Sequence, residues 1–306
     1  MTERLSILII TYNREEDTLE LLKSLKTQVD YEQYIGEVLL LNNASTVSYD
    51  RLKAYIAEHP EMNIRYIEHT ENLGVARGRN YLIKEAKYPL LLVLDDDVVF
   101  DDVNGIRNAA TTFNQPLFAQ NNTAIVSFCV FYYDTLERQK NAFPHKKQSK
   151  YIGRQQFLTS YFIGGAHLVR RALFDEIGLY PTTFFYGTEE YDLGFRILNA
   201  GYTIGYSEAV KVLHKESPFG RVTNSEKQAM LWYNKSTVAW KYLPKKYFYT
   251  TAILWSLLVL KKTGFDLKTW FKTWPKIMRI PKDQVRTPIS KEALNYIDSV
   301  EGRLWY

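Results

Sequence analysis

The chain has 306 residues, of which 46% are hydrophobic and 24% charged. This balance is typical of a globular protein and excludes a largely disordered chain, and the length suffices for one large α/β domain with an appendage. The net charge of +5 is unevenly spread, because residues 226–306 hold 15 Lys and Arg against 6 Asp and Glu, whereas residues 1–225 hold 24 against 28. A single cysteine, Cys129, excludes an intrachain disulfide and fits a buried strand in a reducing cytosol.

Apolar runs alternate with helix-like stretches along the first hundred residues. The chain enters its first apolar run without the features of a secretory signal peptide, so we expect none. Strands are expected at 5–10, 38–41, 64–68 and 90–94, and helices at 15–26, 49–58 and 75–85. This order predicts βαβ units in an α/β fold, with a Rossmann-like, mostly parallel sheet flanked by helices. Ligands of such sheets bind at the carboxyl ends of the strands.

The pattern in the second half is less regular. Residues 137–156 are polar and basic, and we interpret them as a long surface loop. A helix is expected near 171–177, and an acidic cluster at 188–192 leads into a further helix that ends at 199–201.

Three consecutive carboxylates, Asp95, Asp96 and Asp97, directly follow the apolar strand 90–94. Adjacent like charges repel, and a hard divalent cation such as Mn²⁺ or Mg²⁺ would neutralise them. Because side chains alternate along a strand, Asp95 and Asp97 share one side, which leaves Asp96 for a hydroxyl such as that of a ribose. The alternative is a solvated acidic turn.

The second acidic cluster comprises Glu189, Glu190 and Asp192, which follow the aromatic residues 184–186. A carboxylate beside apolar rings can have a raised pKa and act as a general base. Alternatively, Thr188 caps a helix and the carboxylates face the positive end of its dipole. The sequence leaves both interpretations open.

His214 follows the short apolar stretch 210–213. A lone histidine is more often structural than a ligand. We expect it to join a metal site only if this strand ends near Asp97, where a neutral imidazole would complete the ligand set.

Taken together, these motifs resemble family-2 glycosyltransferases of the GT-A fold, over roughly residues 4–245. No dinucleotide-binding glycine motif or phosphate-loop lysine competes with this resemblance. Seven short motifs occur in the family's order, at residues 9–14, 41–45, 71–80, 94–97, 164–166, 189–196 and His214. The resemblance implies an inverting enzyme of the bacterial surface-polysaccharide type, similar to rhamnosyltransferases.

The resemblance also implies a nucleoside diphosphate sugar as donor, with UDP or dTDP favoured over GDP. Tyr12 would stack on the nucleobase, and Asp97, with Asp95 and His214, would bind Mn²⁺ or Mg²⁺. Glu190 would be the base, with Glu189 as its alternative and Asp192 as a third candidate. The implied donor site comprises Thr11, Tyr12, Asn13, Arg14, Asn42, Asn43, Arg79, Asn80, Asp95, Asp96, Gly165 and Ala166.

The chain departs from the family pattern at two positions. Asn42 stands where the family usually has an aspartate that accepts a hydrogen bond from the base, and an amide both accepts and donates, which leaves the base open. Glu190 replaces a commoner aspartate, so its carboxylate reaches further by about one bond, and Glu189 stays an alternative base.

Two regions are expected on this basis. Residues 1–225 would form the catalytic domain, with a nucleotide-binding half at about 1–100 and an acceptor half at about 101–225, and residues 226–306 a helical extension. Two other functions are alternatives. A sugar-nucleotide pyrophosphorylase would need a glycine-rich signature after the first strand, and in a carbohydrate-binding protein without activity the clustered carboxylates would have no purpose.

The extension is basic and holds all six tryptophans. Its apolar run 247–260 has 14 residues between lysine pairs, which is shorter than the ~17 to 25 residues of a spanning helix. A core helix and an interfacial helix both fit, and we favour the interface, because lysine and tryptophan suit an anionic membrane surface.

That interpretation predicts a cytoplasmic protein, peripheral at the inner face of the cell membrane. The acceptor implied by the resemblance is a glycan or a lipid-linked glycan. We expect no nucleic-acid partner, because no nucleic-acid-binding module accompanies the basic residues. A homodimer stays open.

Overall fold

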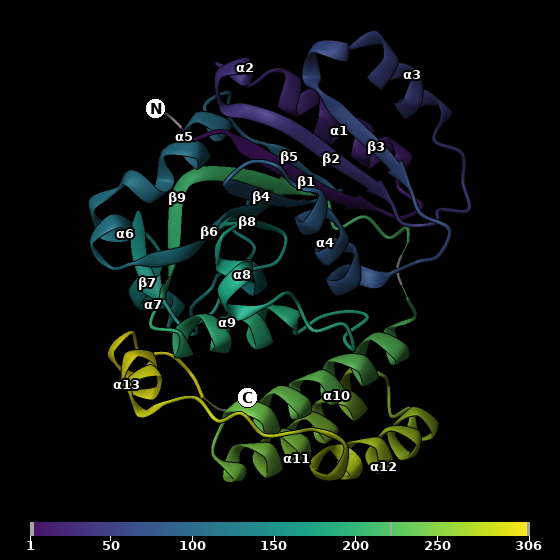
Figure 1. Ribbon diagram of the computed structural model, residues 1–306. Coiled ribbons are helices and arrows are strands. Elements are labelled where there is room, and N and C mark those ends of the chain that lie inside the picture. The colour runs from purple at the N-terminus through teal and green to yellow at the C-terminus, as the bar shows by residue number, and fades with distance from the viewer. Residues whose placement is uncertain (1–2, 221, 305–306) are drawn as a thin grey trace.

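The computed structural model describes residues 3–220 and 222–304. Trp305, counted with the extension above, lies outside these residues. A nine-stranded sheet spans the described part of the catalytic region, with helices on both faces, and a layer of helices from the C-terminal extension lies beneath it (Figure 1).

The first four strands run parallel, as predicted, and lie in the order β3-β2-β1-β4. Side chains of β1, β2 and β4 are buried almost throughout, because helices cover both faces of this half of the sheet. The elements are β1 (Leu5–Thr11), α1 (Glu15–Lys26), α2 (Tyr31–Tyr34), β2 (Ile35–Asn42), α3 (Asp50–Glu58), β3 (Ile64–Glu68), α4 (Gly74–Glu85) and β4 (Leu90–Asp95).

The second half makes the sheet mixed rather than mostly parallel. β8 lies antiparallel between β4 and β6, and β9 pairs with β6 in parallel and with β5 and β7 antiparallel. The elements are β5 (Val98–Phe100), α5 (Gly105–Thr111), α6 (Pro116–Gln120), β6 (Thr123–Tyr132), β7 (Gln156–Thr159), β8 (Ala166–Arg170), α8 (Leu173–Ile177), α9 (Glu189–Asn199) and β9 (Thr203–His214).

Residues 137–156 are not simply the surface loop that their polarity predicts. Phe143, His145 and Tyr151 are buried, and their rings pack with Phe157 of β7 and with Tyr206 of β9. The segment includes α7 (Gln148–Tyr151). Its polar side chains cover an aromatic cluster, which the polarity of the individual residues does not indicate.

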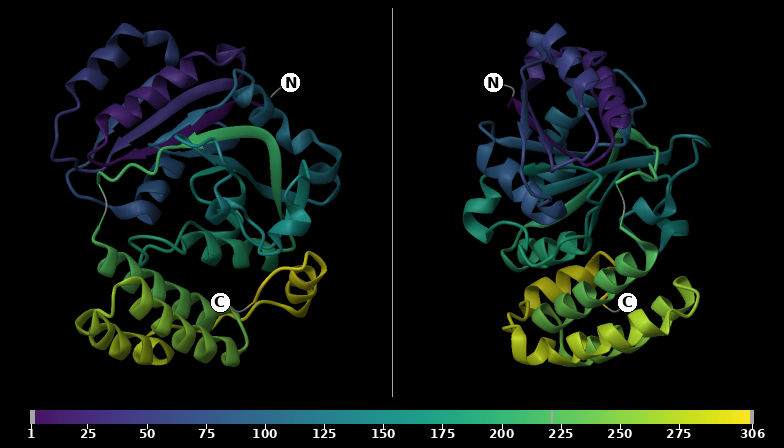
Figure 2. Two further views of the ribbon diagram at one scale, coloured as in Figure 1. Left: turned by 180° about the vertical axis from the view of Figure 1, so that it is seen from behind. Right: turned by 90° about the vertical axis from the view of Figure 1, so that its right-hand side faces the viewer.

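The extension forms α10 (Asn224–Tyr242), α11 (Lys245–Lys262), α12 (Leu267–Asp283) and α13 (Lys291–Ser299). α11 and α12 pack on α10 on the side away from the sheet, as Figures 1 and 2 show. Trp232, Trp240 and Trp255 are at most 9% exposed, inside the core between these helices.

The expected interfacial role of these tryptophans is therefore wrong, because they form the apolar core of the helical layer. The apolar run of α11 fits neither prediction alone: Phe248, Trp255 and Val259 are buried, whereas Ile253 and Leu257 on its other side are exposed. In the part of the chain that the structure describes, no helix is both long and apolar enough to cross a membrane.

Candidate active site

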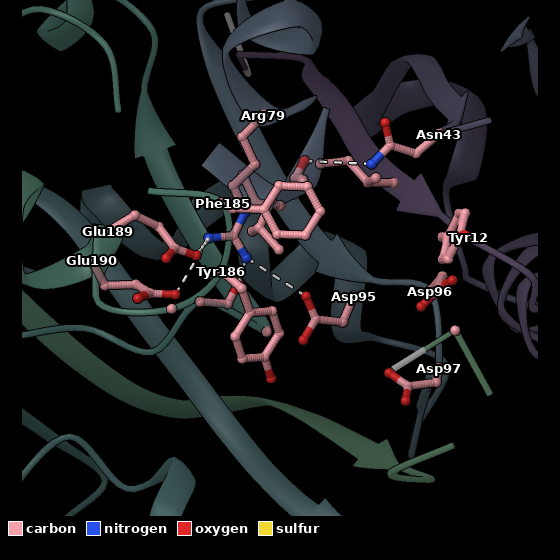
Figure 3. Close-up of a pocket in the computed structure, with 18 of the residues that line it drawn as sticks. Tyr12, Asn43, Arg79, Asp95, Asp96, Asp97, Phe185, Tyr186, Glu189 and Glu190 are labelled. Atoms are coloured by element: carbon pink, nitrogen blue, oxygen red, sulfur yellow. Dashed lines mark hydrogen bonds and ion pairs between the residues drawn. The ribbon is translucent and has the colours of Figure 1, made fainter. Parts of the chain in front are cut away.

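A cavity of about 720 Å³ opens at the carboxyl ends of β1 and β4, within the size range of small-molecule sites. One wall carries Tyr12, Asp96 and Asp97, and the opposite wall carries Glu189 and Glu190 (Figure 3). Residues of the loop 184–188 and of α10 close the remaining side.

The strand register brings His214 to the carboxylates. β5 pairs antiparallel with β9, so that Val98 lies opposite His214 and the preceding Asp97 meets the imidazole. Nε2 of His214 lies 3.2 Å from Oδ1 of Asp97. The condition set for His214 from the sequence, that its strand ends near Asp97, is met.

Burial and neighbouring charges act differently on two of the carboxylates. Burial raises the pKa of Asp96 to about 7, although the Arg14 guanidinium 2.7 Å away opposes this. Burial also works to raise the pKa of Asp97, but the hydrogen bond and charge of His214, together with Arg14, lower it to about 2. Asp97 is therefore held as an anion.

Asp95, Asp97 and His214 form a group that could hold a divalent cation. One ligand atom from each lies within 4.8 Å of the others, and carboxylates are ligands that suit hard divalent ions such as Mn²⁺ and Mg²⁺. Nδ1 of His214 lies 2.9 Å from Oε1 of Gln139, which directs Nε2 toward Asp97. Gln139 lies in the segment 137–156 and was not predicted for the site.

The opposite wall is built around Arg79 of α4, whose side chain is 4% exposed. Its Nη1 lies 3.2 Å from Oε1 of Glu189 and 3.3 Å from Oε1 of Glu190, and its Nη2 lies 3.6 Å from Oδ1 of Asp95. One guanidinium thus links the first turn of α9 to the end of β4 (Figure 3).

Glu189 and Glu190 differ in access to the cavity. The side chain of Glu189 is 2% exposed, and burial and the charge of Glu190 raise its pKa well above the usual range. The side chain of Glu190 is 16% exposed. Gly164 permits its close approach, because a Cβ there would collide with Oε1 of Glu190.

Thr188 occupies the cap position of α9 but makes no capping hydrogen bond. Its backbone is left-handed, with φ of 78°, and its hydroxyl is buried without a hydrogen-bond partner among the described residues. The capping interpretation of this cluster is therefore wrong for Thr188, and the glutamates contact Arg79 instead.

Asp192 does not line the cavity. Its buried carboxylate accepts hydrogen bonds from Nε of Arg196 at 2.9 Å, Nζ of Lys241 at 2.6 Å and the hydroxyl of Tyr242 at 2.8 Å. These contacts join α9 to α10. Asp192 therefore connects two helices and does not face the cavity.

The predicted donor-site residues divide into two groups. Those that line the cavity are Tyr12, Arg14, Asn43, Arg79, Asp95, Asp96 and Gly165. Those that do not line it are Thr11, Asn13, Asn42, Asn80 and Ala166.

Two residues of the second group, Asn42 and Asn80, connect neighbouring segments through hydrogen bonds. Asn42 accepts one from Ser45 N and donates one to the hydroxyl of Tyr66, and Asn80 exchanges two with the backbone of Tyr180.

Several side chains that sequence reasoning did not assign also line the cavity, among them Phe185, Tyr186, Lys227 and Leu231. Lys227 and Leu231 belong to α10, beyond the expected catalytic domain. Their spacing of one helical turn was visible in the sequence, but nothing there indicated which face of α10 meets the pocket.

Comparison with known proteins identifies the family. Residues 6–178, more than half of the chain, match glycosyl transferase family 2. The chain belongs to that family. An uncharacterized protein of Haemophilus influenzae is 30% identical to this family-2 chain over 183 residues, which are 58% of the chain and 92% of the relative.

Two further relatives share less of their length with the family-2 chain. An uncharacterized glycosyltransferase of Bacillus subtilis, YwdF, is 28% identical over 58% of the chain and 62% of its own length. A teichoic acid poly(glycerol phosphate) polymerase of Staphylococcus epidermidis is 31% identical over 31% of the chain, but that match covers only 13% of the polymerase.

Solved structures show the same GT-A type of fold at low sequence identity. The mannosyltransferase PcManGT of Pyrobaculum calidifontis, in complex with GDP-Man and Mn²⁺, is 17% identical with a TM-score of 0.61, over 98% of this chain and 79% of that one. GalNAc-T7 with UDP, GalNAc and Mn²⁺ gives 0.63 at 17% identity, over 81% of this chain and half of that one. S. aureus TarS with UDP-GlcNAc gives 0.60 at 15% identity, over 97% and 83%.

Proposed function

We propose that this cavity transfers a sugar from a nucleoside diphosphate sugar to an acceptor hydroxyl, with inversion at the anomeric carbon. The observation that carries the proposal is the arrangement of two acidic groups on opposite walls of one cavity: Asp95 and Asp97 with His214 on one side, and the accessible Glu190 on the other. Membership of a glycosyl transferase family argues against a sugar-nucleotide pyrophosphorylase, which transfers a nucleotidyl group, and against a non-catalytic carbohydrate-binding protein.

The donor is proposed to lie along the wall that carries Tyr12 and Asp96. Tyr12 would stack on the nucleobase and Asp96 would meet the ribose, with Arg14 and Asn43 beside them. The fold neighbours were solved with UDP, UDP-GlcNAc or GDP-Man, which supports a nucleotide sugar but not one base. We favour UDP or dTDP, with a hexosyl or deoxyhexosyl group.

Asp97, Asp95 and His214 are the residues that would hold Mn²⁺ or Mg²⁺. A divalent ion bound there would stabilise negative charge on the departing diphosphate. Asn42 contributes only indirectly in this proposal, because Ser45 and Tyr66 already engage its amide.

Glu190 is proposed as the general base. In a single displacement, its carboxylate takes the proton of the acceptor hydroxyl while that oxygen bonds to the anomeric carbon and the bond from this carbon to the diphosphate breaks. Glu189 suits this role less well, because it is buried and its raised pKa favours the protonated form. Its position favours a supporting role next to Arg79.

The acceptor is proposed to be a growing or lipid-linked glycan of the bacterial surface, handled at the inner face of the membrane. The named relatives support this setting, since one of them is a teichoic acid polymerase. The cavity wall formed by Tyr186, Lys227 and Leu231 is the side proposed for this acceptor.

The test compares Glu190→Gln with the wild type, using a panel of nucleotide sugars. Loss of the base should lower turnover about 10² to 10⁴-fold, while donor affinity, measured by calorimetry, stays the same. Glu58→Gln, at an exposed position of α3, is the matched control. Unchanged turnover of Glu190→Gln would reject Glu190 as the base, and failure of every nucleotide sugar to bind would reject the function.

A further inference from the structure

Exposed apolar side chains gather on the two outermost helices of the extension. Figures 1 and 2 show α11 and α12 side by side beneath α10, at the far side of the molecule from the sheet. The six that we name the outer face are each between 44% and 65% exposed: Tyr249, Ile253, Leu254, Leu257, Leu267 and Phe271.

The spacing of these residues places those of each helix on one side of that helix. Tyr249, Ile253 and Leu257 recur every fourth residue along α11, and Leu267 and Phe271 do the same on α12. The opposite stripes of both helices, including Trp255 and Ile277, pack into the core that they share with α10. The exposed stripes consequently point away from α10.

Cations surround this apolar surface. α11 and α12 together hold nine Lys and Arg against one Asp. Lysine pairs stand at both ends of α11, and Lys268, Lys272 and Lys276 are exposed along α12. A second copy docked face to face would bring like charges together, whereas anionic headgroups would neutralise them.

We propose that the outer face binds the headgroup region of an anionic phospholipid bilayer, with α11 and α12 lying in the plane of the membrane. Apolar side chains would enter the boundary between headgroups and acyl chains while the lysines contact lipid phosphates. This inference goes beyond the transfer reaction and does not depend on it. From the sequence, the tryptophans were expected to contact the membrane. In this proposal the residues of the outer face do so instead, because Trp232, Trp240 and Trp255 are buried.

The proposal also orients the enzyme. α10 supplies Lys227 and Leu231 to the cavity and carries α11 and α12 on its outer side. Helices pack with their axes about 8 to 10 Å apart, so one helix layer separates the acceptor wall from the bilayer. An acceptor tethered to lipid would reach the cavity from the membrane beside it.

The test measures co-flotation of the full chain with vesicles of phosphatidylcholine, with or without phosphatidylglycerol. The wild type should bind only the anionic vesicles, and raising the salt to about 0.5 M should weaken that binding. A variant with Ile253→Ser, Leu257→Ser and Phe271→Ser should bind about tenfold more weakly or worse. Replacement of Lys268, Lys272 and Lys276 by Gln should weaken both the binding and its salt dependence, since six of the nine cations of α11 and α12 remain.

The matched control is Val47→Ser with Val103→Ser, two exposed apolar residues of the catalytic region that should leave binding unchanged. All variants should melt like the wild type, because every substituted side chain is exposed. Equal binding by wild type and the triple serine variant would overturn the proposal. A dimer in sedimentation that the serine variant dissociates, with no vesicle binding, would also overturn it and assign the face to a second copy. Vesicle binding without nucleotide binding would leave this inference standing and reject the proposed function.

Discussion

Arg79 organises the acidic groups of the cavity. Its buried guanidinium contacts Glu189, Glu190 and Asp95, residues from two distant parts of the chain. Burial alone would lower the pKa of Arg79, but the surrounding tyrosine and carboxylates raise it, so the side chain stays charged. The sequence predicted Arg79 near the donor through family resemblance, but its contacts with the candidate bases arise only from the fold.

Replacement of Asp97 tests the metal site. Asp97→Asn exchanges an anionic ligand for a neutral amide, so the stabilisation of the protein by Mn²⁺ together with a nucleoside diphosphate should disappear. Thermal melting with and without Mn²⁺ measures this. Asp101→Asn, at a position paired with Lys211, is a control that should keep the full shift. An unaltered shift in Asp97→Asn would place the ion elsewhere.

Glu189 should make stability depend on pH. Its pKa is raised in the folded state, so between its ordinary value and the raised one the folded protein keeps a proton that the unfolded chain releases. The free energy of unfolding therefore falls as pH rises through this window. As pH rises from about 5 to about 8, the melting temperature of Glu189→Gln should fall less than that of the wild type. Parallel pH profiles for the two proteins would contradict the raised pKa.

At the scale of elements, the join between α9 and α10 fixes the candidate base. The carboxylate of Asp192 accepts hydrogen bonds from Arg196 of its own helix and from Lys241 and Tyr242 of α10. Asn234 of α10 also donates to the carbonyl oxygens of Tyr186 and Gly187, just before α9 begins. The position of Glu190 therefore depends on a helix outside the matched family region.

Asp192→Asn should be strongly destabilising, because it leaves the largely buried Lys241 without its anionic partner. We expect a loss of about 3 kcal/mol in the free energy of unfolding. Tyr242→Phe, which removes one hydrogen bond to the same carboxylate, should cost about 1 kcal/mol. Urea unfolding measures both. Equal losses would show that the ion pair contributes little beyond an ordinary hydrogen bond.

Most strands and helices of the first hundred residues could be predicted closely, because continuous apolar runs and helical periodicity are local signals, whereas the short α2 and β5 were missed. β8 could not be predicted, since its antiparallel insertion between β4 and β6 is a long-range pairing. Without it, the sheet was expected to be mostly parallel. The prediction of a surface loop at 137–156 was wrong for a related reason, because its aromatic residues are buried against β7 and β9, and β9 is distant in the sequence.

For the whole molecule, the apolar core crosses the boundary expected near residue 225. Leu193 and Phe195 of α9 share one buried cluster with Val238 of α10 and Ala293 of α13. The matched family region ends at residue 178. The extension could be predicted as helical and basic, but amphipathic spacing does not tell which face meets the protein and which meets solvent.

Deletion of residues 226–306 should therefore prevent stable folding of the remaining chain. It would expose the apolar side of α9 and remove Lys227 and Leu231 from the cavity. Circular dichroism on heating should show no cooperative transition for residues 1–225. A fragment that is monomeric and melts sharply would instead support two independent domains.

The lining of the cavity carries five carboxyl groups, Asp95, Asp96, Asp97, Glu189 and Glu190, against His214 and the three basic side chains of Arg14, Arg79 and Lys227. Once the pH exceeds the raised pKa values of Asp96 and Glu189, the carboxylates outnumber the cations, and a bare diphosphate would meet a surplus of its own sign on entering. A donor whose diphosphate already carries a divalent cation would be attracted to the cavity instead. The order of binding would then be imposed by electrostatics, with the ion accompanying or preceding the nucleotide.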